Sequence, residues 1–485
     1  MASQLEKPHV VIFPFMAHGH TLPLLDLSKA LSQRHIKVTI ITTPSNSISI
    51  SKYLPNHPFL NLVQIPFPSS IPGLPEGCEN TADLPSMDLH PRFLQATKHL
   101  QEPFQRLLHQ MSDSNSLPIC VISDFFLGWT LASCKLFGVP RLVFHGMGVF
   151  SMAVSKIAWV QAEKCETNSN SESNNIPLSL PGIEIPFVLT TADLPAVVNS
   201  PGHDDPFSQF VAEAAEAEAN SWGIVVNSFV ELEGNYVSSL ESFYQNGAKA
   251  WCVGPLCLLS EERFRSSPAP DEDQDQHEMI MKWLATHDHV PASVILVSFG
   301  TQAQISPAQL DEVAYGLEEA GVPFLWVVRS NSWSLPDETE ERLKGKGLIT
   351  RQWVDQPKIL KHPTIGGFLS HCGWNSVMES LSAGVPILAW PMLAEQSLNA
   401  KLVVEGLHAG VELEKTRSLG AEVVSVSREA ICRGVKELME GRRGRIAKEK
   451  SQTLGEVARQ AVEQEGSSYD SLTKLIDQLC ASQLK

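Results

Sequence analysis

The stretch Trp353–Gln396 decides how the rest of the chain is interpreted, and it reads WVDQPKILKHPTIGGFLSHCGWNSVMESLSAGVPILAWPMLAEQ. Its apolar run Thr364–Leu369 predicts a buried strand, which passes through the polar segment SHCGWNS into a segment with helical spacing. A Gly-containing loop that opens a helix presents unpaired backbone N–H groups, which bind phosphate without a metal. Because an aromatic residue precedes this unit and the acid–amide pair Glu395–Gln396 follows it, the stretch predicts a nucleotide-sugar site.

The order of predicted elements indicates two α/β domains. His9–Phe15 and Ile36–Thr42 are Val- and Ile-rich runs separated by a helical segment that starts near Thr21, which makes a βαβ unit. Further strands are predicted at Pro118–Ser123, Arg141–His145, Gly223–Asn227, Ser293–Phe299, Phe324–Val328, Leu348–Thr350 and Pro386–Ala389, and a helix is predicted at Pro307–Ala320. The predicted fold class is therefore α/β, with two Rossmann-like, doubly wound domains that face each other across a cleft.

The polar, acidic segment Ser260–Gln276 interrupts this alternation and is predicted to be an exposed linker. The predicted division is a first domain at 1–250, a linker at 251–277, a second domain at 278–465 and a closing amphipathic helix within 466–485. A further segment, Thr167–Asn175, has low apolar content and is predicted to be a mobile surface loop.

The composition argues against several classes of protein. The 37 Lys and Arg residues and 54 Asp and Glu residues give a net charge of −17, which is unfavourable for binding nucleic acid. No run reaches the roughly 18–20 apolar residues of a membrane helix, so no stable membrane insertion is expected. The N-terminus shows no basic leader followed by a long apolar stretch, and the nine Cys form no CxxC pair. Reduced thiols and a cytoplasmic location are therefore expected.

From its first Trp to its last Gln, the stretch 353–396 resembles the signature of plant secondary-product glycosyltransferases, in family 1 of the UDP-glycosyltransferases. The resemblance covers essentially the whole chain and is weakest between about residues 150 and 250. It implies the GT-B fold, with an acceptor-binding first domain, a UDP-sugar-binding second domain and a final helix that packs back toward the first. It also implies a UDP-sugar as donor substrate, a small-molecule acceptor and no cofactor. A monomer is expected.

The candidate donor-binding residues follow from side-chain chemistry and match the family signature. Trp353 can stack on uracil, Glu379 can accept hydrogen bonds from ribose, and Glu395 and Gln396 can bind sugar hydroxyls. His371, Asn375 and Ser376 can donate to the diphosphate. The resemblance adds Ser298, Gln356 and the backbone of Val354 and Trp374.

Simpler interpretations exist for single members of this set. Ser376 and Glu379 match a capping box, S-x-x-E, which needs no ligand, and Trp353 or His371 alone fits a packing or loop role. Family members whose signature ends in Gln usually prefer UDP-glucose. Gln396 therefore favours glucose, with another UDP-sugar as the alternative.

The turn after the first predicted strand offers a candidate general base. A neutral His with a buried carboxylate behind it suits proton removal from a hydroxyl. The family places the base after Gly and before x-x-Pro, which selects His20 rather than His18, and it places the orienting acid at Asp124. An Asp at this position can also cap the helix predicted near Gly128. A single in-line displacement would invert the anomeric centre and give a β-O-glucoside.

No metal is expected at the site. The acidic run Asp271–Asp275 has no strand before it, so it is interpreted as a solvated charge run, and His287–His289 lacks further ligands at metal-site spacing. A UDP-sugar epimerase of the same fold is the alternative activity. It would use several acidic residues around the sugar and no acceptor pocket.

The acceptor is expected to bind near His20 in the first domain. Apolar residues suited to a phenolic, flavonoid or terpenoid are Phe15, Met16, Phe125, Phe126, Met147, Phe150 and Trp159, although core packing is the simpler role for each alone. Where many relatives carry Thr or Ser, this chain has Gly146, which removes a hydroxyl contact or leaves room for a larger acceptor.

Overall fold

The structure is a computed structural model that describes residues 7–54, 57–164, 176–199, 205–259, 271–330, 333–336, 339–414 and 425–482. The predicted loop Thr167–Asn175 lies outside the described residues, as do residues 260–270 of the predicted linker.

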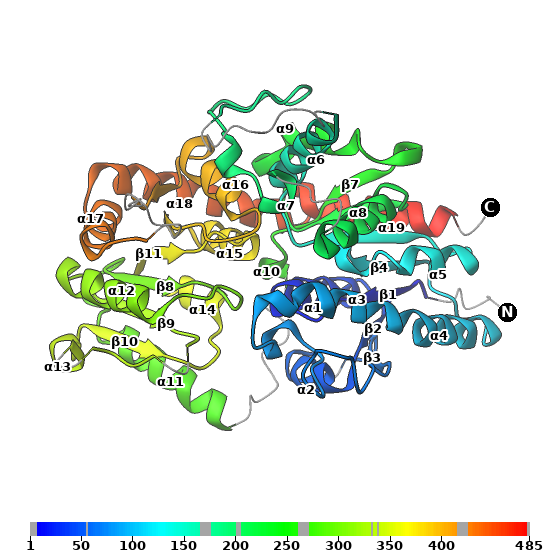
Figure 1. The fold of residues 1–485 in the computed structure, drawn as a ribbon, viewed down its shortest axis with the longest axis horizontal. Coiled ribbons are helices and arrows are strands. Elements are labelled where there is room, and N and C mark those ends of the chain that lie inside the picture. The colour runs from blue at the N-terminus through cyan, green and yellow to red at the C-terminus, as the bar shows by residue number, and fades with distance from the viewer. Residues whose placement is uncertain are drawn as a thin grey trace.

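Two parallel sheets, one in each half of the chain, form the framework (Figure 1). The first sheet has seven strands in the order β3-β2-β1-β4-β5-β6-β7, and the second has six in the order β10-β9-β8-β11-β12-β13. The strands are β1 His9–Phe13, β2 Lys37–Thr42, β3 Leu60–Gln64, β4 Cys120–Asp124, β5 Arg141–His145, β6 Gly223–Val226, β7 Lys249–Cys252, β8 Val294–Ser298, β9 Phe324–Val327, β10 Gly347–Thr350, β11 Ile365–Ser370, β12 Ile387–Ala389 and β13 Gly410–Glu412. The predicted fold class is confirmed.

Helices connect the strands and cover the sheets. Those of the first half are α1 His18–Gln33, α2 Pro44–Tyr53, α3 His90–Thr97, α4 Gln101–Asp113, α5 Thr130–Leu136, α6 Val149–Lys164, α7 Ala196–Asn199, α8 Pro206–Ala219, α9 Val230–Glu241 and α10 Leu256–Leu259. Those of the second half are α11 Asp271–Ala285, α12 Pro307–Ala320, α13 Thr339–Leu343, α14 Gln356–Leu360, α15 Trp374–Ala383, α16 Gln396–Lys401, α17 Arg428–Met439, α18 Arg442–Val462 and α19 Ser467–Ser482.

The strand β1 is buried on both faces, as expected for a central parallel strand. Val10 and Ile12 belong to one apolar cluster with residues of α1 and α19, and the alternate residues Val11 and Phe13 belong to another with residues of α3 and α4. In Figure 1, α19 (red) lies beside the first half of the chain although it follows the second half in sequence. Its Leu472, Leu475 and Leu479 are almost fully buried there.

The predicted central strands are found within one or two residues of their expected bounds, and the edge strands β3, β7 and β13 were not predicted. β3 and β13 are only partly buried and β13 has three residues, so neither produces a long apolar run. The predicted boundary at residue 250 falls inside β7. The acidic run Asp271–Asp275 begins α11, so this part of the expected linker is helical.

One apolar cluster contains residues from both halves. It joins Phe150 of α6 and Tyr236 of α9 to Trp374 and Met378 of α15 and to Ala458 of α18. The two halves therefore share part of a hydrophobic core rather than meeting only through polar surface. Among the described helices, none is long and apolar enough to cross a lipid bilayer.

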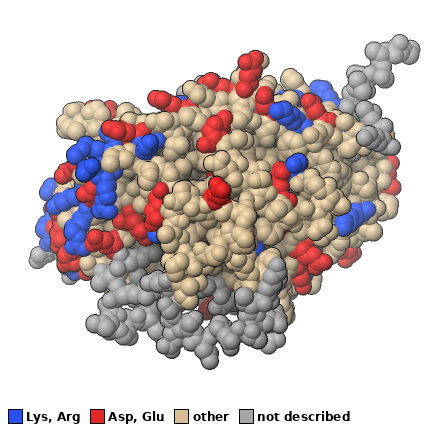
Figure 2. Space-filling model, turned by 90° about the horizontal axis from the view of Figure 1, so that it is seen from above, with Lys and Arg blue, Asp and Glu red and all other residues tan. Residues whose placement is uncertain are grey.

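Charged side chains are unevenly spread on the face seen in Figure 2. Lys and Arg gather at the left end, where α17 and α18 lie, and acidic residues lie among them. The exposed basic residues of α18 include Arg442, Arg443 and Arg445. The rest of this face carries few and scattered charges.

Candidate active site

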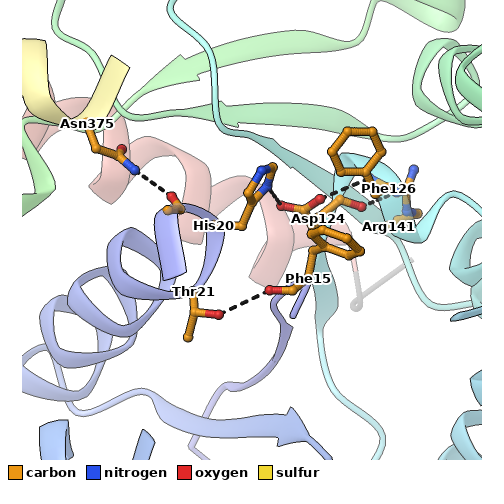
Figure 3. A network of polar contacts seen from close by, with 8 residues as sticks. Phe15, His20, Thr21, Asp124, Phe126, Arg141 and Asn375 are labelled. Atoms are coloured by element: carbon orange, nitrogen blue, oxygen red, sulfur yellow. Dashed lines mark hydrogen bonds and ion pairs between the residues drawn. The ribbon is translucent and has the colours of Figure 1, made fainter. Parts of the chain in front are cut away.

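A histidine–aspartate pair lies at the carboxyl edge of the first sheet (Figure 3). β1 leads into α1, and β4 ends at Asp124. Because β1 and β4 are parallel neighbours, their carboxyl ends meet at one edge. There the Nδ1 atom of His20 lies 2.7 Å from Oδ2 of Asp124. α1 starts at His18, three residues earlier than predicted, so His20 stands in the first turn of the helix itself.

Asp124 is held rigidly by its surroundings. Its side chain is fully buried, and its Oδ1 accepts a hydrogen bond of 2.9 Å from the backbone N–H of Phe126. The buried Arg141 donates to the backbone carbonyl of Asp124 at 3.1 Å. The aspartate therefore caps the short turn Phe125–Leu127 with one oxygen and contacts His20 with the other. Asp124 does not cap the helix predicted near Gly128, because that helix, α5, begins at Thr130 with Trp129 as its N-cap.

The environment of His20 favours a proton on its ring. Burial lowers the pKa of the imidazole, but the Asp124 carboxylate beside it outweighs burial, and Glu395 adds to this effect, so the pKa lies above its ordinary 6.5. The side chain remains 22% exposed. If the Nδ1–H donates to Asp124, Nε2 is left as the free acceptor, which is the arrangement a general base needs. The Nδ1 atom of His18 is buried and has no hydrogen-bond partner within the described part of the chain.

In the second half, β11 passes through a short loop into α15, as the sequence predicts. Gly373 is the N-cap of α15 and makes no side-chain cap, so the first N–H groups of the helix are open to an anion. His371 lies over this helix start, with Gly300 and Gly373 beside its ring. Burial outweighs the effect of the Ser298 backbone beside the ring and lowers the pKa of His371 to about 4.

The predicted ribose and diphosphate residues form a connected group around Gln356 at the start of α14. Its Nε2 donates to Oε2 of Glu379 at 2.7 Å and to Oγ of Ser376 at 3.0 Å. Burial raises the pKa of Glu379 to about 8. The capping-box interpretation of Ser376 and Glu379 is wrong, because the N-cap is Gly373 and Ser376 lies inside the helix.

The other predicted donor-site residues lie around the same edge of the second sheet. Trp353 is 36% exposed and contacts Tyr53 of the first half edge to face, with ring centroids 5.4 Å apart. Val354 is buried in the apolar cluster that contains β8 residues, and Ser298 ends β8 opposite Ser370 of β11. The indole of Trp374 is buried, so only its backbone is available to a ligand.

Glu395 and Gln396 stand where β12 leads into α16. Oε1 of Gln396 accepts hydrogen bonds of 3.0 Å from the backbone N–H groups of Met392 and Leu393, so Nε2 is the amide atom left for a ligand. Glu395 accepts from Asn399 at 3.2 Å, and burial raises the pKa of its carboxyl. The nearby charge of His20 lowers the pKa of Glu395 slightly and that of Glu395 raises the pKa of His20, although the two residues belong to different halves of the chain.

Hydrogen bonds join the start of α15 to the start of α1 and to the end of β6, and neither contact was predicted from the sequence. Asn375 donates through Nδ2 to the backbone carbonyl of Gly19, the residue before His20 (Figure 3). The neighbouring Trp374 donates through Nε1 to the carbonyl of Asn227 at 2.8 Å. Asn227 is a polar residue at the end of a predicted strand, and this position is the only signal that could have suggested it.

Of the predicted acceptor residues, two contact the ring of His20. Phe15 and Phe126 have centroids 5.4 Å and 5.5 Å from it. Phe150 is fully buried against Phe187 and Tyr236, so it packs in the core. A Cβ atom at Gly146 would lie 3.5 Å from Cε1 of His20, so this glycine leaves space directly beside the ring.

The described residues contain no group of three or more His, Cys, Asp or Glu side chains arranged to hold a metal ion. Nδ1 of His287, two residues after the end of α11, lies 3.0 Å from Oγ1 of Thr286 and 3.2 Å from the carbonyl oxygen of Trp283, to which it can donate. Each cysteine in the described ranges is a free thiol.

Two domains with parallel sheets, in contact through the starts of α1 and α15, form the GT-B fold, and comparison with known proteins identifies the family. Residues 280–441 match the family "UDP-glucoronosyl and UDP-glucosyl transferase", and residues 6–179 match "Glycosyltransferase, N-terminal domain". UDP-glycosyltransferase 90A1 of Arabidopsis thaliana is 39% identical, over 99% of this chain and 98% of that protein. Scopoletin glucosyltransferase of Nicotiana tabacum is 36% identical, over 97% and 98%.

A solved structure has the same architecture. Medicago truncatula UGT71G1 complexed with UDP-glucose superposes with a TM-score of 0.80 at 28% identity, over 99% of this chain and 100% of that one. The chain belongs to the plant UDP-glycosyltransferases of family 1 and is an enzyme of that class. The resemblance found in the sequence is confirmed.

Gly373→Ala should weaken donor binding. The added Cβ would lie 2.5 Å from Nε2 of His371, so the imidazole must move away from the start of α15. We expect KM for the UDP-sugar to rise about tenfold or more, equivalent to about 1.4 kcal/mol. Steady-state kinetics checks this, with thermal unfolding as the control for folding. An unchanged KM in a folded variant would show that the His371 position does not matter for the donor.

Proposed function

We propose that the enzyme transfers glucose from UDP-glucose to a hydroxyl group of a small apolar plant metabolite, with inversion, giving a β-O-glucoside. The observation that carries the proposal is the 2.7 Å contact between His20 and Asp124 at the edge that faces the start of α15. The acceptor class is phenolic, flavonoid or terpenoid. Scopoletin glucosyltransferase, a relative over nearly the full length, acts on one such small molecule and supports this assignment.

In the proposed mechanism the second half binds the donor. Trp353 stacks on the uracil, and Glu379, oriented by Gln356, accepts hydrogen bonds from the ribose. The open N–H groups of α15, with Asn375, Ser376 and the neutral His371, bind the diphosphate. These groups also stabilise the negative charge that develops on the departing UDP.

The first half supplies the base. Nε2 of His20 removes the proton of the acceptor hydroxyl as its oxygen attacks the anomeric carbon and the bond to UDP breaks. Asp124 holds the imidazole in the required tautomer and stabilises the imidazolium that forms. Attack opposite the leaving group inverts the anomeric centre, so an α-linked donor gives a β-glucoside.

Other features belong to the same proposal. Residues 1–250 bind the acceptor, 251–277 link the domains, 278–465 bind the donor and 466–485 return to the first domain, where α19 packs. The diphosphate is bound without a metal ion, and the enzyme acts as a cytoplasmic monomer.

The direct test combines UDP-glucose with a panel of phenolic and terpenoid alcohols in the presence of EDTA, and measures product mass and anomeric configuration. We expect β-glucosides, and we expect His20→Ala to lower kcat by about two to four orders of magnitude, the range for loss of a general base. An α-linked product, loss of activity in EDTA or a near-normal rate in His20→Ala would each overturn the corresponding part of the proposal.

The dependence of kcat/KM on pH should show the raised pKa of His20. The base must be neutral, so activity falls as the pH drops through this pKa, which lies above the ordinary 6.5 because Asp124 outweighs the effect of burial. Asp124→Asn removes the negative charge, so the acidic limb should move to lower pH while the maximal rate also falls. A limb at the same pH in both enzymes would assign the titration to another group.

Donor choice can be tested at the end of the β12–α16 connection. Gln396→His replaces the amide whose Nε2 is free for the sugar, and should raise the use of UDP-galactose relative to UDP-glucose. Competition between the two donors, with products separated after hydrolysis, measures the ratio. Gln396→Ala is the control, because it loses the amide without adding an imidazole. An unchanged ratio would show that this residue does not distinguish the sugars.

A further inference from the structure

A second imidazole shares the aromatic surroundings of His20. His90 is the first residue of α3. Its ring centroid lies 6.4 Å from that of Phe15 and 6.1 Å from that of Phe126, edge to face in both cases. Phe15 and Phe126 are the same two rings that contact His20. His90 is not predictable from the sequence, because a lone histidine outside a motif carries no signal.

The aromatic group around the two imidazoles is built from three separate elements. Phe15 follows β1 and is fully buried, whereas Phe126 follows β4 and is partly exposed. The ring centroid of Phe207 in α8 lies 5.9 Å from that of His90. A flat apolar molecule could pack against Phe126 and still reach His20. His90 and Phe126 are partly exposed, so both side chains are accessible to such a molecule.

The ring nitrogens of His90 have no hydrogen-bond partner among the residues that the structure describes, whereas His20 and Asp124 are hydrogen-bonded. Burial, and to a lesser degree the charge of the nearby His20, lower the pKa of His90 to about 4. The imidazole is therefore neutral at neutral pH and has one N–H donor and one nitrogen acceptor. A neutral group with both functions suits a hydroxyl or carbonyl of a ligand better than an ion.

We propose that His90 binds a second oxygen function of the acceptor while His20 acts on the hydroxyl that is glucosylated. The preferred acceptor is then a flat aromatic molecule with at least two oxygen functions on its ring system, rather than a terpenoid alcohol with a single hydroxyl. This inference rests on the proposed function. It assigns His90 to acceptor choice and positioning, not to the chemical step.

Phenol, catechol, resorcinol and hydroquinone test it, because they differ only in the presence and spacing of a second hydroxyl. His90→Leu keeps an apolar side chain of similar size and removes both hydrogen-bonding functions, whereas His90→Gln keeps a donor and an acceptor. We expect the wild-type enzyme to favour at least one diphenol over phenol in kcat/KM. For that diphenol, His90→Leu should lower kcat/KM about tenfold, which is the upper range for the loss of one hydrogen bond. His90→Gln should retain most of the wild-type kcat/KM.

Two measurements separate this role from a structural one. KM for UDP-glucose and kcat/KM for phenol should change by less than about twofold in His90→Leu, since neither depends on the second oxygen. Equal losses for phenol and the diphenols, no loss at all, or failure of His90→Gln to restore the preference would overturn the inference and leave the proposed function intact. If the wild-type enzyme glucosylates none of these phenols or larger alcohols, the proposed function itself fails.

Discussion

The start of α15 contacts the start of α1, and the arrangement of the site depends on this contact. Asn375 donates to the carbonyl of Gly19, and the adjacent Trp374 donates to the carbonyl of Asn227. One helix carries the proposed base in its first turn, and the other presents the N–H groups proposed to bind the diphosphate. Their separation decides whether an acceptor oxygen can reach the anomeric carbon. Catalysis by positioning depends strongly on such distances.

Both helix starts are placed by the same property of parallel sheets. Each follows a buried central strand, β1 or β11, and the carboxyl ends of the neighbouring strands β4 and β12 lead to Asp124 and to Glu395. Residues far apart in sequence therefore meet without any local signal between them. The raised pKa of His20 combines contributions from Asp124 in its own half and Glu395 in the other.

The central strands could be predicted because they depend on local pattern, whereas His20 and Asp124 were selected through the family resemblance. A buried parallel strand is a continuous apolar run, and a polar residue directly after it must lie at the sheet edge. The edge strands β3 and β13 were missed because they are short or half-exposed. The capping box considered as an alternative for Ser376 and Glu379 does not form, because the chain enters α15 at Gly373, which has no capping side chain. The Asn375–Gly19 contact depends on how the two sheets are oriented relative to each other, which no local pattern encodes.

The shared hydrophobic core has a consequence for exchanging halves between relatives. A Cβ atom at Gly148 would lie 2.8 Å from the Trp374 ring and from Oε1 of Glu233, so the indole fits only where residue 148 has no side chain. The carboxylate of Glu233 in turn accepts hydrogen bonds from the backbone N–H groups of Val149 and Phe150, which fixes the start of α6. A chimaera that takes its donor half from one parent and its acceptor half from another must therefore match these positions, or the seam between the parents will contain a clash or a void.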